Sequence, residues 1–351
     1  MNFTFSEEQL MSAQAARAVL DDTCTSTQLR SLLTRDEPRD ASRWQALAES
    51  GLCSVLAPES AGGMELGTVD FVLIAEACGY TALPEPLVEH AGVAVPLLAA
   101  AVPQLPLLGE LVSGASTLAI AHPVNPFVAD ADGATALLLP HVGEVHLLQT
   151  AHARLTRQAS IDPFRRLFRV EWSPSDATRI ADAASGVALW DDALDRGALF
   201  SAAQCLGIAQ RCVDLASAYA KERKQFGKPI GSYQAVKHAL ATVQVKIEFA
   251  KPVVYAAAAQ FEQRDVQSRA RISHAKIVAA EAADLAARTA VQVHGAMGCS
   301  WEVDVHFFLK RALALNFAWG DPLFHRRRVA ARVHGAALGP DQTFGDQQTH
   351  A

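Results

Sequence analysis

The 351-residue chain lacks the features that mark several large classes of protein. Its apolar runs, such as Leu97 to Val102, are too short to cross a bilayer, and its acidic N-terminus contains no apolar signal segment. Its six cysteines include no CxxC pair, and its twelve histidines show no metal-ligand spacing. With a net charge of -6 and no Lys/Arg stripe, it has no electrostatic footprint for nucleic acid. We therefore expect a cytoplasmic protein with reduced thiols, no metal site, no membrane span and no nucleic-acid partner.

Two kinds of pattern follow one another along the chain. Residues 1 to about 110 carry helical spacing, beginning with a capping box at Ser6 and Gln9. Short apolar runs separated by Pro, Gly, Asn and Asp then predict strands. Alanine-rich helical patterns fill the rest and favour an antiparallel bundle. The predicted helices are 6–20, 41–50, 68–79, 87–101 (kinked at Pro96), 190–222, 232–263, 266–295, 302–318 and 322–337, and the predicted strands are 118–121, 136–139, 145–148 and 169–172.

These patterns predict a fold that is mainly α with a small β domain. We expect an N-terminal helical domain over residues 1–105, a reduced middle β domain over 106–187, a C-terminal helical bundle over 188–338 and a tail over 339–351.

The segment from Lys221 to Ile230 combines a cation, an amide and an aromatic ring before a Gly/Pro break. The guanidinium of Arg223 offers a fork to phosphate oxygens, and Phe226 offers a ring to a flat ligand. The alternative is a solvated helix end with Phe226 packed in the core. Charge and spacing alone favour that alternative.

This segment resembles the flavin-clamping motif of the acyl-CoA dehydrogenase family. The family's domain order matches, and so do the segments Trp44 to Gly51, Pro58-Glu59 with Gly62-Gly63, the helix carrying Glu76, and the bundle from about Leu206 to Arg332. The resemblance covers about two thirds of the chain and implies that matching residues grip the adenosine diphosphate half of a neighbouring subunit's FAD. Those residues are Arg223, Gln225 and Phe226.

A second motif, Gln292 to Gly298, is similar to the family's glycine-rich turn, with Ala296 in place of its middle glycine. Small residues let backbone N–H groups approach a pyrophosphate closely. The resemblance implies that Gln292, Gly295, Ala296 and Gly298 bind the cofactor. The alternative is that Gly295 only caps the preceding helix.

The family's catalytic glutamate has no counterpart here. Its reaction needs a carboxylate in a desolvated pocket to remove the α proton of a thioester. The position matching the usual glutamate is Trp319 or Gly320. Asp321 is a weak substitute, because before Pro322 it is better placed to cap a helix.

A second location for the base, used by some family members, matches Gly197. Asp195 lies nearby, although helix capping is its favoured role. The family's flavin-covering loop corresponds to residues 120–126, where Ala121 and His122 replace its Thr and Glu. Trp172-Ser173 is a faint match to a second flavin-covering element. Arg326 to Arg328 form a solvated helix face or contact an acyl-CoA phosphate.

The resemblance implies a subunit of an FAD-dependent acyl-CoA dehydrogenase that completes the FAD site of a catalytic partner. We expect an α2β2 heterotetramer that desaturates an acyl-CoA and passes electrons to an electron-transfer flavoprotein. Two alternatives stay open: a self-sufficient homo-oligomer with a relocated base, Asp321 or Asp195, and a flavin-free scaffold. Fatty, branched and sterol-type acyl groups all stay open as substrates.

Overall fold

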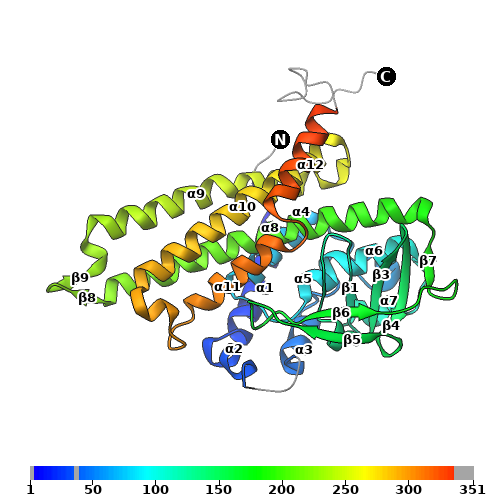
Figure 1. Ribbon diagram of the computed structural model, residues 1–351, viewed down its shortest axis with the longest axis horizontal. Coiled ribbons are helices and arrows are strands. Elements are labelled where there is room, and N and C mark those ends of the chain that lie inside the picture. The colour runs from blue at the N-terminus through cyan, green and yellow to red at the C-terminus, as the bar shows by residue number, and fades with distance from the viewer. Residues whose placement is uncertain (1–3, 35–38, 336–351) are drawn as a thin grey trace.

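A computed structural model describes residues 4–34 and 39–335. The chain forms helices first, then two small sheets, then long helices that run side by side (Figure 1). The prediction of a mainly helical protein with a small β domain is confirmed. The expected tail, 339–351, lies outside the described residues.

The N-terminal helices begin where the sequence supplies side-chain caps. Ser6 and Gln9 form the predicted capping box, and Thr25 and Gln28 form a second one that starts a helix we did not predict. Asp40 caps a third helix by accepting from Ser42 N. These helices and the one that follows are α1 (Glu7–Thr23), α2 (Ser26–Leu32), α3 (Ala41–Glu49) and α4 (Thr68–Tyr80).

The helix predicted over 87–101 is interrupted before Pro96. It consists of α5 (Leu87–Glu89), a π segment (His90–Ala94) and α6 (Val95–Ala101). In the π segment the N–H of Val95 donates to the carbonyl of His90, five residues back. Pro96 sits in the first turn of α6, where its missing N–H is tolerated. The break is therefore a π bulge and not a proline kink. A further unpredicted helix, α7, follows at Leu107–Val112.

Seven strands form two sheets. The first has the order β1-β3-β4-β7, with β1 parallel to β3 and the other pairs antiparallel, and the second has the antiparallel order β2-β6-β5. Strands β2, β5 and β7 were not predicted: β2 has only two residues, and exposed polar residues obscure the alternation in β5 and β7. The bounds are β1 Leu118–Ile120, β2 Val128–Ala129, β3 Ala136–His141, β4 Glu144–Gln149, β5 Arg154–Gln158, β6 Leu167–Glu171 and β7 Arg179–Ala181.

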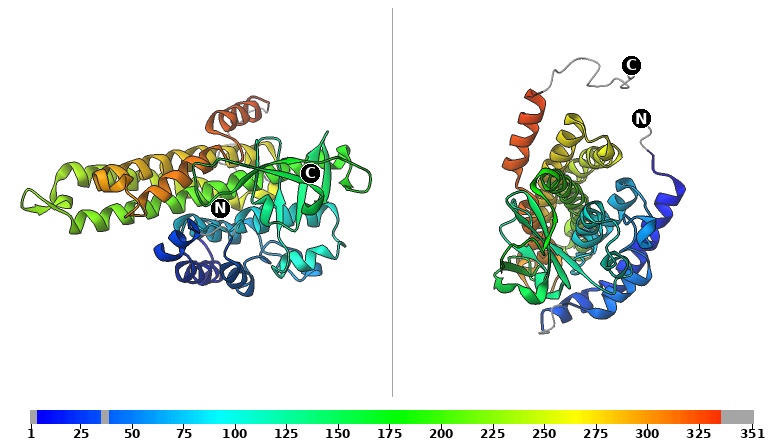
Figure 2. Two further views of the ribbon diagram at one scale, coloured as in Figure 1. Left: turned by 60° about the horizontal axis from the view of Figure 1, so that its bottom comes forward. Right: turned by 90° about the vertical axis from the view of Figure 1, so that its right-hand side faces the viewer.

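The long helices pack along most of the molecule. They are α8 (Ala183–Glu222), α9 (Gln234–Ala259), α10 (Val266–His294), α11 (Val305–Phe317) and α12 (Pro322–His334). Helix α8 begins seven residues earlier than predicted, because the side chain of Asp182 caps it at Ser185 N. Glycines let α4 and α8 touch: a methyl group on Gly207 would overlap the carbonyl of Glu76. Helix α12 projects from the side of the bundle (Figure 2).

The core contains most of the thiols. Five of the six cysteines are buried and Cys299 is exposed, and all six are free, as predicted. No helix of the described ranges is both long enough and apolar enough to cross a membrane.

Candidate functional site

The segment after α8 folds into a small hairpin. Strands β8 (Lys224–Gln225) and β9 (Lys228–Pro229) pair antiparallel around the two turn residues Phe226 and Gly227. Both turn residues have positive φ, 53° and 83°, as a type I′ turn requires. Phe226 is 93% exposed, so the alternative that packed it in the core is wrong. A phenylalanine in this conformation is strained by about 1–2 kcal/mol, and no burial offsets that strain within this chain.

Backbone contacts hold the hairpin in place. The N–H of Ile230 donates to the carbonyl of Arg223 at 2.8 Å, and the hydroxyl of Tyr233 donates to the carbonyl of Gln225 at 3.2 Å. The ammonium of Lys228 lies 4.3 Å from the centre of the Tyr233 ring. The side chains of Arg223, Gln225 and Phe226 are exposed, and in the described part of the chain Arg223 has no ion-pair partner. They are available to an external ligand.

The second motif lies at the same end of the bundle. Helix α10 ends at His294, whose ring stacks on Tyr219 with centroids 4.3 Å apart. The carbonyl of Tyr219 in turn accepts from the N–H of Arg223 at 2.8 Å. Gly295 caps α10 with φ of 62°, so it has the capping role that was the alternative. Gln292, Gly295 and Ala296 are exposed, and Gly298 is buried against Val291.

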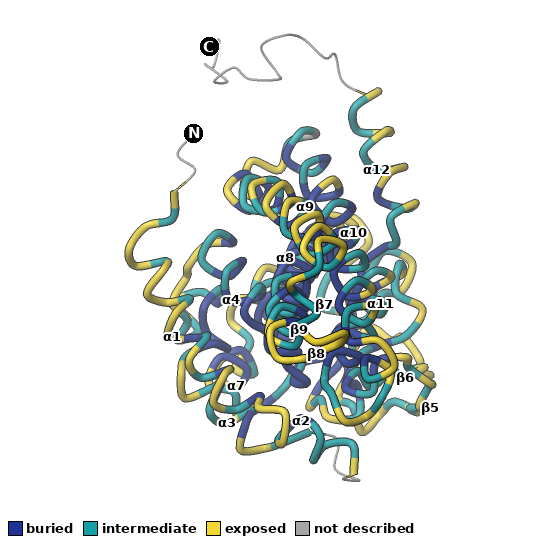
Figure 3. Tube along the Cα trace, turned by 90° about the vertical axis from the view of Figure 1, so that its left-hand side faces the viewer, coloured by how far each residue is buried: buried dark blue, intermediate teal, exposed yellow. Residues whose placement is uncertain are grey.

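We call these two motifs together the clamp: Arg223, Gln225, Phe226, Gln292, Gly295, Ala296 and Gly298. The clamp lies at one end of the long helices and the two sheets lie at the other (Figure 1). Seen from the clamp end, the exposed hairpin is in front of the bundle (Figure 3). Helix α8 alone has 40 residues, a length of about 60 Å. A ligand held between the clamp and a β domain must therefore use the β domain of another chain.

Away from the clamp, Trp319 occupies the position expected for the catalytic base and lies on α8. It is only 3% exposed, with φ of 59°, and Gly320 follows with φ of 95°. A methyl group on Gly197 would overlap the indole of Trp319, so the ring lies directly on α8. The two positions that matched the family's alternative bases are thus in contact, and neither carries a carboxylate. We call this contact the Trp319 plug.

The loop that corresponds to the flavin-covering loop joins this plug. Nδ1 of His122 accepts from Val124 N at 3.1 Å, and Nε2 donates to the carbonyl of Trp190 at 3.1 Å. Burial lowers the pKa of His122 to about 4, so it is neutral near pH 7. Oδ1 of Asn125 accepts from the N–H of Trp319 at 2.8 Å. His122 also packs against the indole of Trp319, with centroids 5.7 Å apart.

The nearby carboxylates are engaged elsewhere. Asp321 caps α12 as predicted, accepting from Phe324 N at 2.7 Å. The capping role expected for Asp195 is wrong, because Asp195 lies buried within α8. Three arginine side chains approach it: Arg328 at 2.8 Å, Arg332 at 3.5 Å and Arg269 at 3.7 Å. Burial raises the pKa of Asp195 and these arginines oppose the rise. The ion pairs of Asp195 therefore hold α12 and α10 against α8.

The structure also describes two other segments singled out in the sequence. Arg326 and Arg327 are exposed, but Arg328 turns inward to Asp195, so Arg326 to Arg328 are only partly a solvated face. Trp172 lies just after β6 and packs against His146, with centroids 5.1 Å apart. It is half-buried and packs against the core of the β domain.

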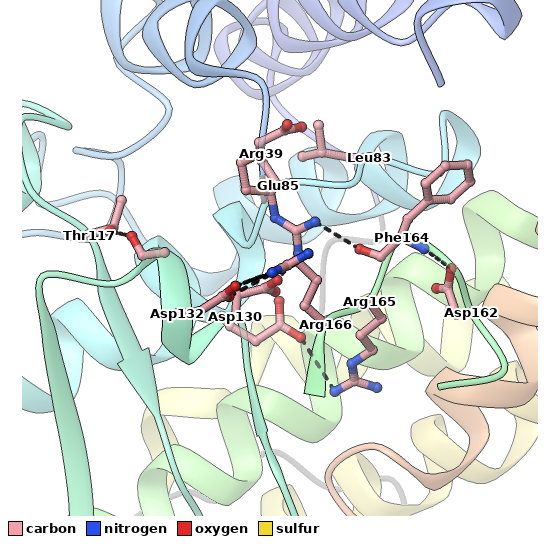
Figure 4. Close-up of polar contacts among 12 residues, drawn as sticks. Arg39, Leu83, Glu85, Thr117, Asp130, Asp132, Asp162, Phe164, Arg165 and Arg166 are labelled. Carbon is pink, nitrogen blue, oxygen red and sulfur yellow. Dashed lines mark hydrogen bonds and ion pairs between the residues drawn. The ribbon is translucent and has the colours of Figure 1, made fainter. Parts of the chain in front are cut away.

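A network of ion pairs that the sequence did not predict fills the junction of the N-terminal helices, the sheets and α11, and Figure 4 shows part of it. The pairs are Arg39–Asp130, Arg43–Glu85 (2.8 Å), Arg165–Glu89 (3.9 Å), Arg166–Asp132 and Arg311–Asp162. Each pair joins residues far apart in sequence, so no local sequence pattern could predict the network. An apolar chain entering this junction would lie against paired charges, an unfavourable surrounding.

Comparisons with known proteins agree with the geometry. A family model described as "Acyl-CoA dehydrogenase, C-terminal domain" matches residues 184–334, and one described as "Acyl-CoA dehydrogenase, N-terminal domain" matches residues 6–103. Acyl-CoA dehydrogenase IpdE2 of Mycobacterium tuberculosis (strain ATCC 25618 / H37Rv) is 31% identical over 310 residues, which cover 87% of this chain and 91% of the relative.

Two solved structures share the fold. A chain of the ChsE4-ChsE5 complex from Mycobacterium tuberculosis aligns with a TM-score of 0.84 at 24% identity, covering 96% of this chain and 100% of that chain. A chain of the Tcur3481-Tcur3483 steroid ACAD aligns with a TM-score of 0.81 at 23% identity, covering 94% of this chain and 98% of that chain.

Proposed function

Because this chain belongs to the acyl-CoA dehydrogenase family of oxidoreductases, we propose that it is the partner subunit of a hetero-oligomeric acyl-CoA dehydrogenase. In this role it completes the FAD site of a catalytic chain and has no reaction centre of its own. The observation that carries the proposal is the contact between Trp319 and Gly197. It fills the place of both possible bases, while the clamp stays exposed.

The clamp residues fit the adenosine diphosphate half of FAD, which family members generally bind. Arg223 supplies a fixed cation with a forked donor set for the pyrophosphate. Phe226 supplies an exposed ring for the adenine. The exposed turn at Gly295 and Ala296 leaves room for the pyrophosphate to approach the backbone, with Gln292 beside it and Gly298 packed beneath. A methyl group at Ala296 is compatible with this fit because Ala296 is exposed.

The centre does not fit the flavin ring. The indole of Trp319 packs against the imidazole of His122, and the side chain of Asn125 accepts from the backbone N–H of Trp319. In our proposal these groups occupy the place where the ring and the base would be needed. In our proposal the catalytic partner supplies the ring pocket, the glutamate and the acyl-CoA tunnel. FAD, when bound, accepts hydride from the β carbon of the thioester. This chain's contribution is to hold the cofactor's far half and to shield it from water.

The likeness to chains of two heteromeric complexes agrees with this arrangement. We propose an α2β2 assembly in which electrons leave to an electron-transfer flavoprotein. Because one neighbour is described as a steroid ACAD, ring-bearing thioesters belong among the acyl-CoA substrates to be tested.

The test is the FAD content of the chain purified alone and together with a catalytic chain encoded beside it. We expect little FAD in the lone chain and one FAD per heterodimer in the complex. Arg223→Ala should lower FAD retention at least tenfold while leaving assembly intact. The matched control is Arg327→Ala, an exposed arginine on α12.

Other outcomes would favour the alternatives. FAD binding and acyl-CoA oxidation by the lone chain would establish a self-sufficient enzyme with a relocated base. No FAD in any combination would establish a flavin-free scaffold. Equal FAD retention in the Arg223 and Arg327 variants would show that Arg223 does not contribute to FAD binding.

A further inference from the structure

A cavity of about 200 Å³ lies where α1, α2, α4, α8 and α11 meet, and it shares no residue with the clamp or the Trp319 plug. Thr25 and Ser26, at the start of α2, line it and are exposed, so the cavity opens to solvent there. Further in, the buried side chains of Cys24, Leu29 and Phe308 form its wall. The cavity therefore has a polar entrance and an apolar interior.

The acidic groups that line this cavity already have cationic partners. Oδ2 of Asp21 accepts from Nε of Arg17 at 2.8 Å, and Oδ1 of Asp304 accepts from Nη2 of Arg30 at 2.5 Å. A cationic ligand would therefore have to compete with an arginine at each carboxylate. A ligand with several negative charges would be repelled by the same two carboxylates.

The guanidinium of Arg211, on α8, lines the cavity without a carboxylate partner. Among the described residues no carboxylate lies within 4 Å of it, and its Nη1 makes only a weak contact, at 3.5 Å, with the hydroxyl of Tyr80. That hydroxyl donates to Asp214 at 2.7 Å. Nη2 has no hydrogen bond to a described residue and, unlike Nε, is not enclosed by protein atoms.

The surroundings of this guanidinium hold it in place without neutralising its charge. Arg211 is half-buried, and its guanidinium carbon lies 5.1 Å from the ring centre of Tyr80 and 5.9 Å from that of Phe308. Aromatic rings at such distances attract a cation but accept no strong hydrogen bond from it. Arginine stays charged at any pH at which the protein is folded. The cavity therefore contains a fixed positive charge with open N–H donors.

We propose that this cavity binds a small organic monocarboxylate with an apolar body, and that the carboxylate accepts from Arg211. Charge-assisted hydrogen bonds between guanidinium and carboxylate are strong, and the apolar body gains from leaving water against Leu29 and Phe308. Asp21 and Asp304 select against a second negative charge. A cavity of about 150 Å³ is known to take up benzene, so this one has room for a benzoate.

Benzoate and benzamide are suitable probes, because they share a shape and only benzoate is charged. Binding is measured by calorimetry on the full chain, in complex with its partner if the chain requires one. We expect saturable binding of benzoate and at least tenfold weaker binding of benzamide. Inorganic phosphate at the same concentration should not displace benzoate.

Arg211→Gln should weaken benzoate binding at least tenfold, because it removes the charge while keeping an N–H donor. The affinity for benzamide should stay within twofold of wild type, which shows that the cavity is intact in the variant. The matched control is Arg327→Gln, which changes an exposed arginine of α12 and should leave both affinities unchanged.

The location is checked without any variant by intermolecular NOEs from benzoate to the methyl groups of Thr25 and Leu29. This measurement decides the matter if Arg211→Gln does not fold. Absence of saturable benzoate binding, or NOEs to other methyl groups, would overturn the site. Equal affinity for benzoate and benzamide, or unchanged benzoate binding in Arg211→Gln, would overturn the role of Arg211. Displacement of benzoate by phosphate would overturn the selection for a single charge.

Discussion

Phe226 and Trp319 are both aromatic residues with positive φ, 53° and 59°, yet one is 93% exposed and the other 3%. At Trp319 the strained backbone is offset by packing of the indole on Gly197. At Phe226 the hairpin holds a bare ring in solvent, with no compensating contact in this chain. Strain without burial points to a function outside the chain. Strain with burial is explained within the chain, because the buried ring stabilises the backbone that holds it.

The largest expected effect is on stability at the plug. Trp319→Ala should lower the free energy of unfolding by about 3–5 kcal/mol, because it removes a large buried ring and leaves a cavity. Backbone strain is unchanged, since alanine and tryptophan both disfavour positive φ. Urea unfolding of the full chain measures the change. A loss below about 1 kcal/mol would mean that the indole does not pack as described.

Lys276 links α10 to α8 and α11 and should give the stability of the bundle a pH dependence. This fully buried lysine of α10 donates to Ser201 Oγ at 2.7 Å and to the carbonyl of Leu315, in the last turn of α11. Burial lowers its pKa from 10.5 to about 8. Between these values the unfolded chain binds more protons than the folded chain, so stability should rise with pH by up to about 3 kcal/mol.

Lys276→Met should flatten this rise from pH 8 to 10.5, as measured by urea unfolding across that window. The control is Lys237→Met, which changes an exposed lysine of α9. If wild type and Lys276→Met keep parallel stability profiles, Lys276 does not titrate within the fold.

A substitution at Gly197, on the α8 side of the plug, should have a smaller effect on stability. Gly197→Ala should destabilise the chain by about 1–3 kcal/mol, because the added methyl overlaps the indole of Trp319. Gly133→Ala is the control, since a methyl there meets no atom within 4 Å. In a Trp319→Ala background the penalty at Gly197 should disappear, which a double-mutant cycle measures. If the free-energy changes of the two substitutions were additive, Gly197 and Trp319 would not interact as described.

The smallest effect on stability is expected at the hairpin. Phe226→Ala should change the free energy of unfolding by less than about 0.5 kcal/mol, because the ring is exposed. In the assembled complex it should nevertheless lower FAD retention, and Trp319→Ala should not. Loss of FAD in the Trp319 variant, with none in the Phe226 variant, would reverse the roles of the two regions.

Much of the fold could be predicted because its signals are local. Ser6 and Asp321 start helices through side-chain caps within three residues, and both were recognised. The exposed strands β5 and β7 escaped because their pattern is weak. Asp195 was misread as a cap, since its three arginine partners lie 74 to 137 residues away, as the numbers 269, 328 and 332 show. Ion pairs between residues so far apart in sequence follow no spacing rule from which they could be predicted.

By itself the sequence determined the clamp motifs, the helical pattern between them and the lack of a carboxylate at positions 197, 319 and 320. These are statements about residue types and local spacing. Only the tertiary structure decided that Trp319 lies on Gly197, that the clamp is remote from the chain's own sheets, and that Arg211 lines a cavity. The physical reason is that each of these depends on the packing of distant segments, which side-chain volume and buried charge select and local periodicity does not.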